Sequence, residues 1–171
     1  MSAVSAVDCL FKGYLDEILN QLKERLGQTL VSVVLYGSVA RGEAGEGSDI
    51  DLLVVSGSFG RSFGSRFELF SEVENSLLSS ESRRRLRQLK RGTLISPVPL
   101  TPEEVKRNPP ILLDIIVDGI ILYDKDGFLK DRLEELEKKL QSLGARRIRL
   151  PSGSWYWDLK PDYQFGEVVE I

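Results

Sequence analysis

Two short apolar segments joined by a glycine-rich connection constrain this chain more than any other feature. Residues 31–36 form a β-branched and apolar run that Gly37 and Ser38 end abruptly, as in a buried strand that enters a tight turn. A second apolar strand follows at 49–56. Glycine lets a backbone approach a ligand closely, and a short helix opened by Ser38 would present free N–H groups to phosphate. The pattern predicts a strand, a phosphate-binding turn, a short helix and a second strand.

The second predicted strand begins with two carboxylates. Asp49 and Asp51 are two positions apart, so we expect both on the same face of the strand, with Ile50 pointing the opposite way. Carboxylate oxygens carried about 7 Å apart along a strand suit Mg²⁺, or Mn²⁺, which is held by one or two protein carboxylates, substrate phosphates and water. We therefore predict a metal site at Asp49 and Asp51 that serves phosphoryl or nucleotidyl transfer.

Four residues near this pair are candidates for nucleotide binding: Gly37, Ser38, Arg41 and Ser48. Arg41 would add positive charge beside the turn, and Ser48 directly precedes the two aspartates. An Asp-x-Asp sequence alone is more often a solvated turn, and a Gly-Ser pair is often an ordinary connection between strand and helix. Their combination at this separation favours a site.

The segments Gly-Ser-Val-Ala-Arg-Gly at 37–42 and Ser-Asp-Ile-Asp-Leu-Leu-Val at 48–54 resemble the signature of the polymerase-β-type nucleotidyltransferase superfamily, especially its small prokaryotic members. A weaker resemblance to archaeal nucleotidyltransferase-domain proteins extends through 118–124 and the Trp-Tyr-Trp sequence at 155–157. The resemblance implies Mg²⁺-dependent transfer of a nucleoside monophosphate from an NTP, first of all ATP, to a hydroxyl. The acceptor would be a small molecule, a protein hydroxyl or an RNA end.

The fold class implied is α/β (α+β): a nucleotidyltransferase fold with a mixed sheet flanked by helices. We expect this domain at 1–144, with a C-terminal β extension at 145–171 packed on the same domain. Periodicity and turn residues predict helices at 7–26, 66–77, 83–91, 111–116 and 128–143, strands at 93–98 and 120–123, a capping box at 101–104, a hairpin of 146–150 with 155–159, and a weak edge strand at 166–171.

Active members of the superfamily usually carry a third carboxylate on a neighbouring strand. The matching strand at 93–98 contains no acid, and the chain has no histidine that could act as a base. Asp114, within an apolar helix, is the first candidate for this catalytic role, although it also fits an exposed helix face. Glu103 or Glu104, or an anionic acceptor, are the others. The alternative function is therefore a catalytically weak or inactive nucleotide-binding module, antitoxin-like, with a helical partner protein.

Charge and cysteine content limit the classes of partner and the cellular compartment that we expect. A net charge of −3 and a pI near 5.2 argue against a general nucleic-acid coat protein. With one cysteine and neither a signal peptide nor a long apolar span, we expect a cytoplasmic protein without membrane contact. Six cations nevertheless occupy the nine positions 83–91. They fit a solvated helix face and a site for a phosphate-bearing acceptor or RNA backbone equally well.

Overall fold

The computed structural model describes residues 9–152, 154–169 and 171. The chain divides into two compact units, and the boundary between them lies in the sequence between Leu129 and Lys130. The domain boundary predicted between 144 and 145, and the packing of 145–171 on the same domain, stay predictions. Among the described helices, none combines the length and apolar character needed to cross a membrane.

The first unit is built on a mixed sheet of four strands in the order β3-β2-β1-β4. β1 runs antiparallel to β2 and β4, and β2 runs parallel to β3. The strands are β1 (Leu30–Tyr36), β2 (Ile50–Ser56), β3 (Ile95–Leu100) and β4 (Ile120–Asp124). The predicted mixed sheet is confirmed, although β3 begins and ends two residues later than its expected range.

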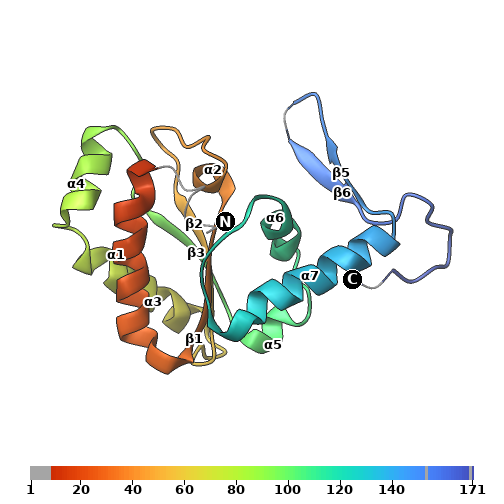
Figure 1. The fold of residues 1–171 in the computed structure, drawn as a ribbon, viewed down its shortest axis with the longest axis horizontal. Helices are drawn as coiled ribbons and strands as arrows, with labels where there is room; N and C mark the ends of the chain where they lie inside the picture. Colours follow the sequence, from red (N-terminus) through yellow and green to blue (C-terminus); the bar gives the residue numbers. More distant parts are fainter. Residues whose placement is uncertain (1–8, 153, 170) are drawn as a thin grey trace. The chain divides into compact units, whose positions relative to one another are not determined.

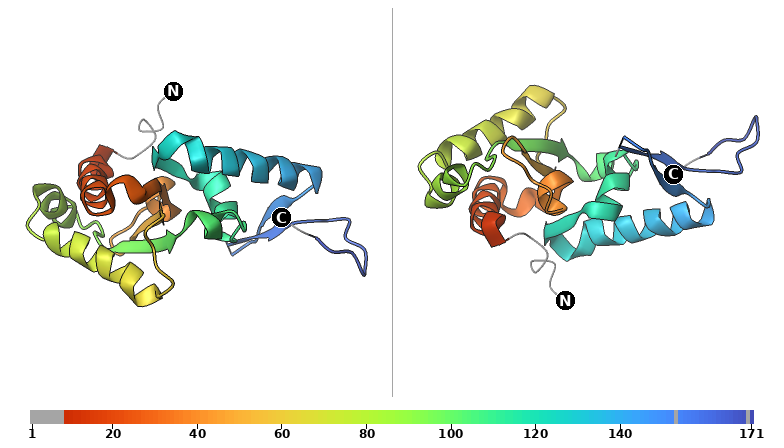
Figure 2. Two further views of the ribbon diagram at one scale, coloured as in Figure 1. Left: turned by 90° about the horizontal axis from the view of Figure 1, so that it is seen from below. Right: turned by 90° about the horizontal axis from the view of Figure 1, so that it is seen from above.

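Helices cover both faces of this sheet (Figures 1 and 2). Alternate residues of the two central strands, such as Leu35 and Leu52, form one core with α1 and α3. The opposite face carries buried Val34 and Leu53, and there α5 and α6 pack on β2 and β1. The helical elements of the unit are α1 (Cys9–Leu26), η2 (Gly27–Thr29), α2 (Gly37–Ala40), α3 (Phe63–Ser76), α4 (Glu81–Gln88), α5 (Pro102–Val105), α6 (Ile111–Asp118) and η3 (Lys125–Gly127).

Sequence signals place most element ends within a few residues. The predicted capping box is present at α5: Thr101 Oγ1 accepts from the Glu104 N–H at 3.2 Å, and the Glu104 carboxylate accepts from the Thr101 N–H at 2.8 Å. The first helix was expected from Val7, which lies outside the described residues. α3 begins at Phe63 rather than near 66, so the helix takes in part of the glycine-rich loop before it.

The second unit contains most of α7 (Phe128–Ser142) and a two-stranded sheet. β5 (Arg146–Arg149) pairs antiparallel with β6 (Trp155–Asp158), which confirms the predicted hairpin. The weak edge strand expected at 166–171 is wrong, because none of its described residues is in a strand. Gly166 has a φ of +95°, and Val168 is 85% exposed, so the weak alternation there has no apolar face to bury.

Candidate nucleotide and metal site

The structure brings the two predicted aspartates to the end of the sheet where β1 enters its turn. β2 begins at Ile50, so Asp51 lies in the strand, partly buried, while Asp49 lies one residue before it and is exposed. Asp51 pairs across the strands with Tyr36, the last residue of β1. The carboxylate of Asp51 is therefore beside the turn that follows Tyr36.

Gly37 lies directly against the Asp51 carboxylate. Its φ is +72°, in the left-handed region that favours glycine. A Cβ at this position would lie 2.1 Å from Oδ2 of Asp51 and 2.9 Å from its Cγ. α2 begins at Gly37, one residue before the predicted start, and Ser38 occupies its first turn. The glycine is thus required by the backbone conformation and by the carboxylate that it faces.

The Asp51 carboxylate is in an environment that disfavours its charge. Burial, the largest cause, raises its pKa, and the charge of Asp49 raises it further. A hydrogen bond with Ser96, which pairs with Asp51 from the parallel strand β3, and the charge of Arg41 lower it, with a net rise. A divalent cation bound by both carboxylates would relieve their repulsion, so this pair of oxygen ligands fits Mg²⁺ or Mn²⁺.

Tyr36 was not predicted as a site residue, yet it reports on the surroundings of Asp51. Burial first, then the charges of Asp51 and Asp114, raise the pKa of its hydroxyl to about 12. Asp114 lies in the first turn of α6, which packs on β1 and α2, and it is partly buried. The predicted catalytic candidate therefore lies on the same side of the sheet as Asp51 and Tyr36.

The family model described as "Nucleotidyltransferase domain" matches residues 15–150, which span both aspartates, the turn and all four strands. This chain belongs to the nucleotidyltransferase domain family. The resemblance seen in the motif is confirmed.

Relatives of this nucleotidyltransferase domain include the "Putative protein adenylyltransferase" of Methanocaldococcus jannaschii, which is 30% identical over 130 residues, 75% of this chain and 82% of that protein. A solved "putative nucleotidyltransferase from Sulfolobus solfataricus" is 21% identical over 74% of this chain and 90% of its own, with a TM-score of 0.45. A toxin-antitoxin structure with AMP-PNP is 16% identical, covers 75% and 91%, and has a TM-score of 0.48. At these TM-scores the structural likeness supports no inference about ligand or partner.

Arg41 of the nucleotidyltransferase domain lies among acidic side chains. Its Nε donates to Oε2 of Glu43 at 2.7 Å, and its Nη1 lies 3.4 Å from Oδ2 of Asp118. These two carboxylates, Glu43 first through its hydrogen bond, raise the pKa of the guanidinium. Part of the charge expected to face phosphate is thus neutralised within the protein, and the role of Arg41 as a nucleotide ligand stays a prediction.

Ser48 organises the loop before the aspartates. Its hydroxyl accepts from the Gly45 N–H at 2.8 Å. Its backbone lies against Gly92, where an added Cβ would be 1.9 Å from the Ser48 carbonyl oxygen. The contact of Ser48 with the nucleotide stays a prediction.

The structure excludes Glu103 and Glu104 as bases for this site. Asp51 pairs with Ser96 at one end of β3, whereas Leu100 at the other end pairs with Val55. The two glutamates follow Leu100, so the sheet separates them from Asp51 by about 13 Å or more along the strand. Among the described residues, no group of three or more His, Cys, Asp or Glu side chains is placed to hold a metal ion.

Proposed function

We propose that this nucleotidyltransferase domain transfers a nucleoside monophosphate from an NTP, first of all ATP, to a hydroxyl acceptor in a Mg²⁺-dependent reaction. The observation that carries the proposal is the contact between Gly37 and Asp51, which sets the carboxylate of Asp51 against the turn that would bind phosphate. Asp49 and Asp51 would hold Mg²⁺, or Mn²⁺, and Gly37, Ser38, Arg41 and Ser48 would contact the nucleotide.

The reaction needs alignment more than covalent help from the protein. The acceptor oxygen forms a bond to the α-phosphorus in line with the bond from that phosphorus to the β-phosphate oxygen, which breaks, and pyrophosphate leaves with the electron pair. Bound Mg²⁺ would supply neutralisation of phosphate charge. The Asp114 carboxylate accepts the hydroxyl proton. The name of the Methanocaldococcus jannaschii relative makes a protein hydroxyl the first acceptor to test, before small molecules and RNA ends.

Removing either metal-binding carboxylate is expected to weaken Mg²⁺-dependent ATP binding. Asp49→Asn and Asp51→Asn should each lose roughly tenfold or more in affinity, equivalent to about 1.4 kcal/mol, and lose the difference between titrations with and without Mg²⁺. Isothermal titration calorimetry measures both. Asp126→Asn is the control, because Asp126 is exposed and follows β4 at the end of the sheet opposite to Tyr36. Equal affinities with and without Mg²⁺ in the wild type would overturn the metal site.

Asp114→Asn is expected to slow transfer about 10²- to 10⁴-fold, the usual contribution of a general base, while Mg²⁺-ATP affinity stays within about twofold of wild type. Pyrophosphate release with an acceptor panel measures the rate. Asp114→Glu, which keeps a carboxylate at this position, should recover part of the lost rate. A transfer rate that is unchanged in Asp114→Asn would assign the proton to another acceptor.

A second candidate function is a nucleotide-binding module without turnover that acts on a helical partner protein, the partner class that the resemblance implies. The observation in its favour is β3, which places Ser96 rather than an acid beside Asp51. Mg²⁺-dependent ATP binding without pyrophosphate release for any acceptor would favour this module over the enzyme.

A further inference from the structure

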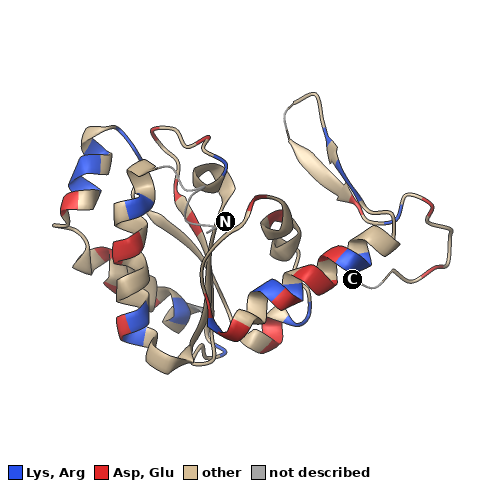
Figure 3. Ribbon diagram, in the orientation of Figure 1, with Lys and Arg blue, Asp and Glu red and all other residues tan. Residues whose placement is uncertain are grey.

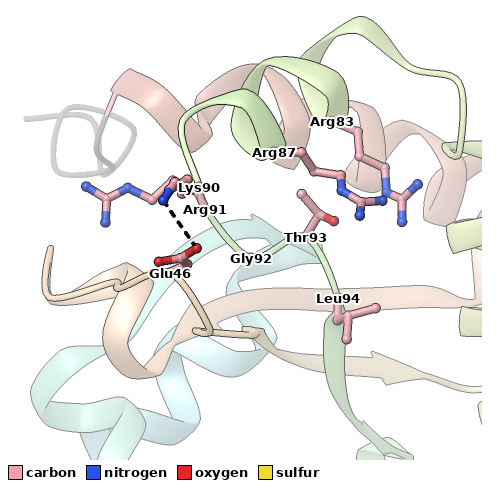
Figure 4. Close-up of a pocket in the computed structure, with 8 residues that line it drawn as sticks. All are labelled: Glu46, Arg83, Arg87, Lys90, Arg91, Gly92, Thr93 and Leu94. Carbon is pink, nitrogen blue, oxygen red and sulfur yellow. Dashed lines mark ion pairs between the residues drawn. The ribbon is translucent and has the colours of Figure 1, made fainter.

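A basic pocket of about 390 Å³ opens between α4 and the segment that leads into β3 (Figure 4). Figure 3 shows how strongly Lys and Arg concentrate on α4. Glu46 is the one acid among the described residues that line the pocket, and residues 92–94 form part of its wall. Four cations line it: Arg83, Arg87, Lys90 and Arg91.

Little of this positive charge is neutralised within the protein. Lys90 Nζ lies 4.0 Å from Oε1 of Glu46, and both side chains are about three-quarters exposed, so their attraction is weak. Arg91 donates to the Ala44 carbonyl oxygen and thereby ties the pocket to the loop before Asp49. In the described part of the chain, no ion pair involves Arg83 or Arg87. The pocket therefore offers cations to an external anion.

The backbone that borders the pocket contacts the segment that carries Asp49. Gly92 packs against the Ser48 backbone so closely that a Cβ would lie 1.9 Å from the Ser48 oxygen, and the Ile50 N–H donates to the Leu94 carbonyl at 2.8 Å. The wall of the pocket thus runs beside Asp49. Because the sheet order is β3-β2-β1, the pocket and the Gly37 turn lie on opposite sides of the aspartate strand.

The positions of the pocket and the Gly37 turn indicate from which side the acceptor approaches. In-line transfer places the attacking oxygen and the leaving pyrophosphate on opposite sides of the α-phosphorus. If the triphosphate lies on the Gly37 turn, on the β1 side, the acceptor approaches from the β3 side. The basic pocket borders that side, on the sheet face that α1, α3 and α4 cover. We propose that the pocket binds acidic residues of an acceptor polypeptide, next to the hydroxyl that receives the nucleotide. This inference rests on the proposed function.

The spacing of the cations favours a polypeptide. Arg83 and Arg87 are four residues apart on a helix, about 6 Å along its axis, and an extended peptide carries alternate side chains about 6.6 Å apart. A single phosphate group is too small to reach every cation in the pocket. An RNA strand has similarly spaced charges, but no aromatic side chain lines the described pocket to stack with bases.

Direct binding tests the pocket without nucleotide. The probes are a fluorescein-labelled peptide with one tyrosine between runs of glutamate, the same peptide with glutamine in place of glutamate, and labelled oligouridylate. By fluorescence anisotropy, the wild-type protein should bind the glutamate peptide about tenfold more tightly than the glutamine peptide. The double variant Arg87→Gln/Lys90→Gln should lose this preference. Glu46→Gln should bind the glutamate peptide more tightly, because it removes a competing carboxylate.

The matched control is Arg84→Gln/Arg85→Gln. It removes the same charge from exposed positions of the same helix that do not line the pocket, and it should keep affinity for the glutamate peptide within about twofold. Equal losses in both double variants would show attraction by overall charge and overturn the pocket. Pocket-dependent binding of oligouridylate, with no preference for the glutamate peptide, would also overturn the proposal. Because these titrations contain neither ATP nor Mg²⁺, their outcome is independent of whether nucleotidyl transfer occurs.

Discussion

Gly37→Ala is expected to reduce nucleotidyl transfer about 100-fold, which a displacement of about 1 Å at a reacting group can cause, while the protein still folds. The added Cβ would lie 2.1 Å from Oδ2 of Asp51 and 3.2 Å from its Cβ, so the Asp51 carboxylate must leave its position beside the turn. Mg²⁺-dependent ATP binding should weaken together with transfer. Pyrophosphate release and calorimetric titration of Mg²⁺-ATP measure the two effects.

Gly42→Ala separates this steric effect from backbone strain. Gly42 has a φ of +70°, almost that of Gly37, but an added Cβ would have nothing within 4 Å. Each alanine variant should therefore lose a similar stability, about 1–2 kcal/mol for a left-handed residue, in denaturant unfolding. Only Gly37→Ala should lose Mg²⁺-dependent ATP binding. If Gly42→Ala loses as much binding, strain in the turn rather than displacement of Asp51 is the cause.

The sequence predicts the features of the site that depend on short segments of the chain. The sequence predicts a strand that ends before Gly37 and a strand that begins near Asp49, because apolar runs and turn residues act over a few positions. Both strands formed within one or two residues of their expected bounds. The family model confirms the resemblance that these residues suggested.

The other features of the site depend on contacts between segments that are distant in the sequence. Tyr36 and Ser96 lie beside Asp51 only because β2 pairs antiparallel with β1 and parallel with β3 in a particular register. No short pattern encodes that register. Likewise, Asp118 reaches Arg41 across 77 positions, so the charge of Arg41 could not be judged from the motif alone. The sequence signal that could have identified Tyr36 as a residue of the site is its position immediately before Gly37.

The role of Glu104, which the sequence offers as a capping residue and as a base, also depends on distant segments. In the structure, Glu104 takes part in the capping box and in a partly buried ion pair. Arg66, in the first turn of α3, is only 4% exposed; its Nη1 lies 2.8 Å from Oε2 of Glu104, and its Nη2 donates to Oε1 at 3.0 Å. The guanidinium also donates to the carbonyl oxygens of Gly60 and Pro99. One arginine thus joins α3, β3 and α5, and Glu104 balances its charge.

Glu104→Ala is expected to lower the free energy of unfolding by about 3 kcal/mol, the lower end for a buried pair that loses one partner. The variant leaves the Arg66 charge buried without its carboxylate and removes one side of the capping box. The lower end applies because the Glu104 side chain is 33% exposed. Urea unfolding at neutral pH measures the loss. Glu103→Ala, which removes an exposed carboxylate from the same helix, should change stability by less than about 0.5 kcal/mol.

The pH dependence of the same variant distinguishes the ion pair from lost packing. The hydrogen bond from Arg66, the largest cause, lowers the pKa of Glu104 below its ordinary value of 4.5. A carboxyl whose pKa is lower in the folded protein binds fewer protons there than in the unfolded chain, so its contribution is complete above pH 4.5 and is lost as the pH falls through the folded-state pKa. The stability difference between wild type and Glu104→Ala should therefore shrink in that acidic range. A difference that stays constant down to full protonation would show that packing and the cap, rather than the charge of Glu104, stabilise this junction.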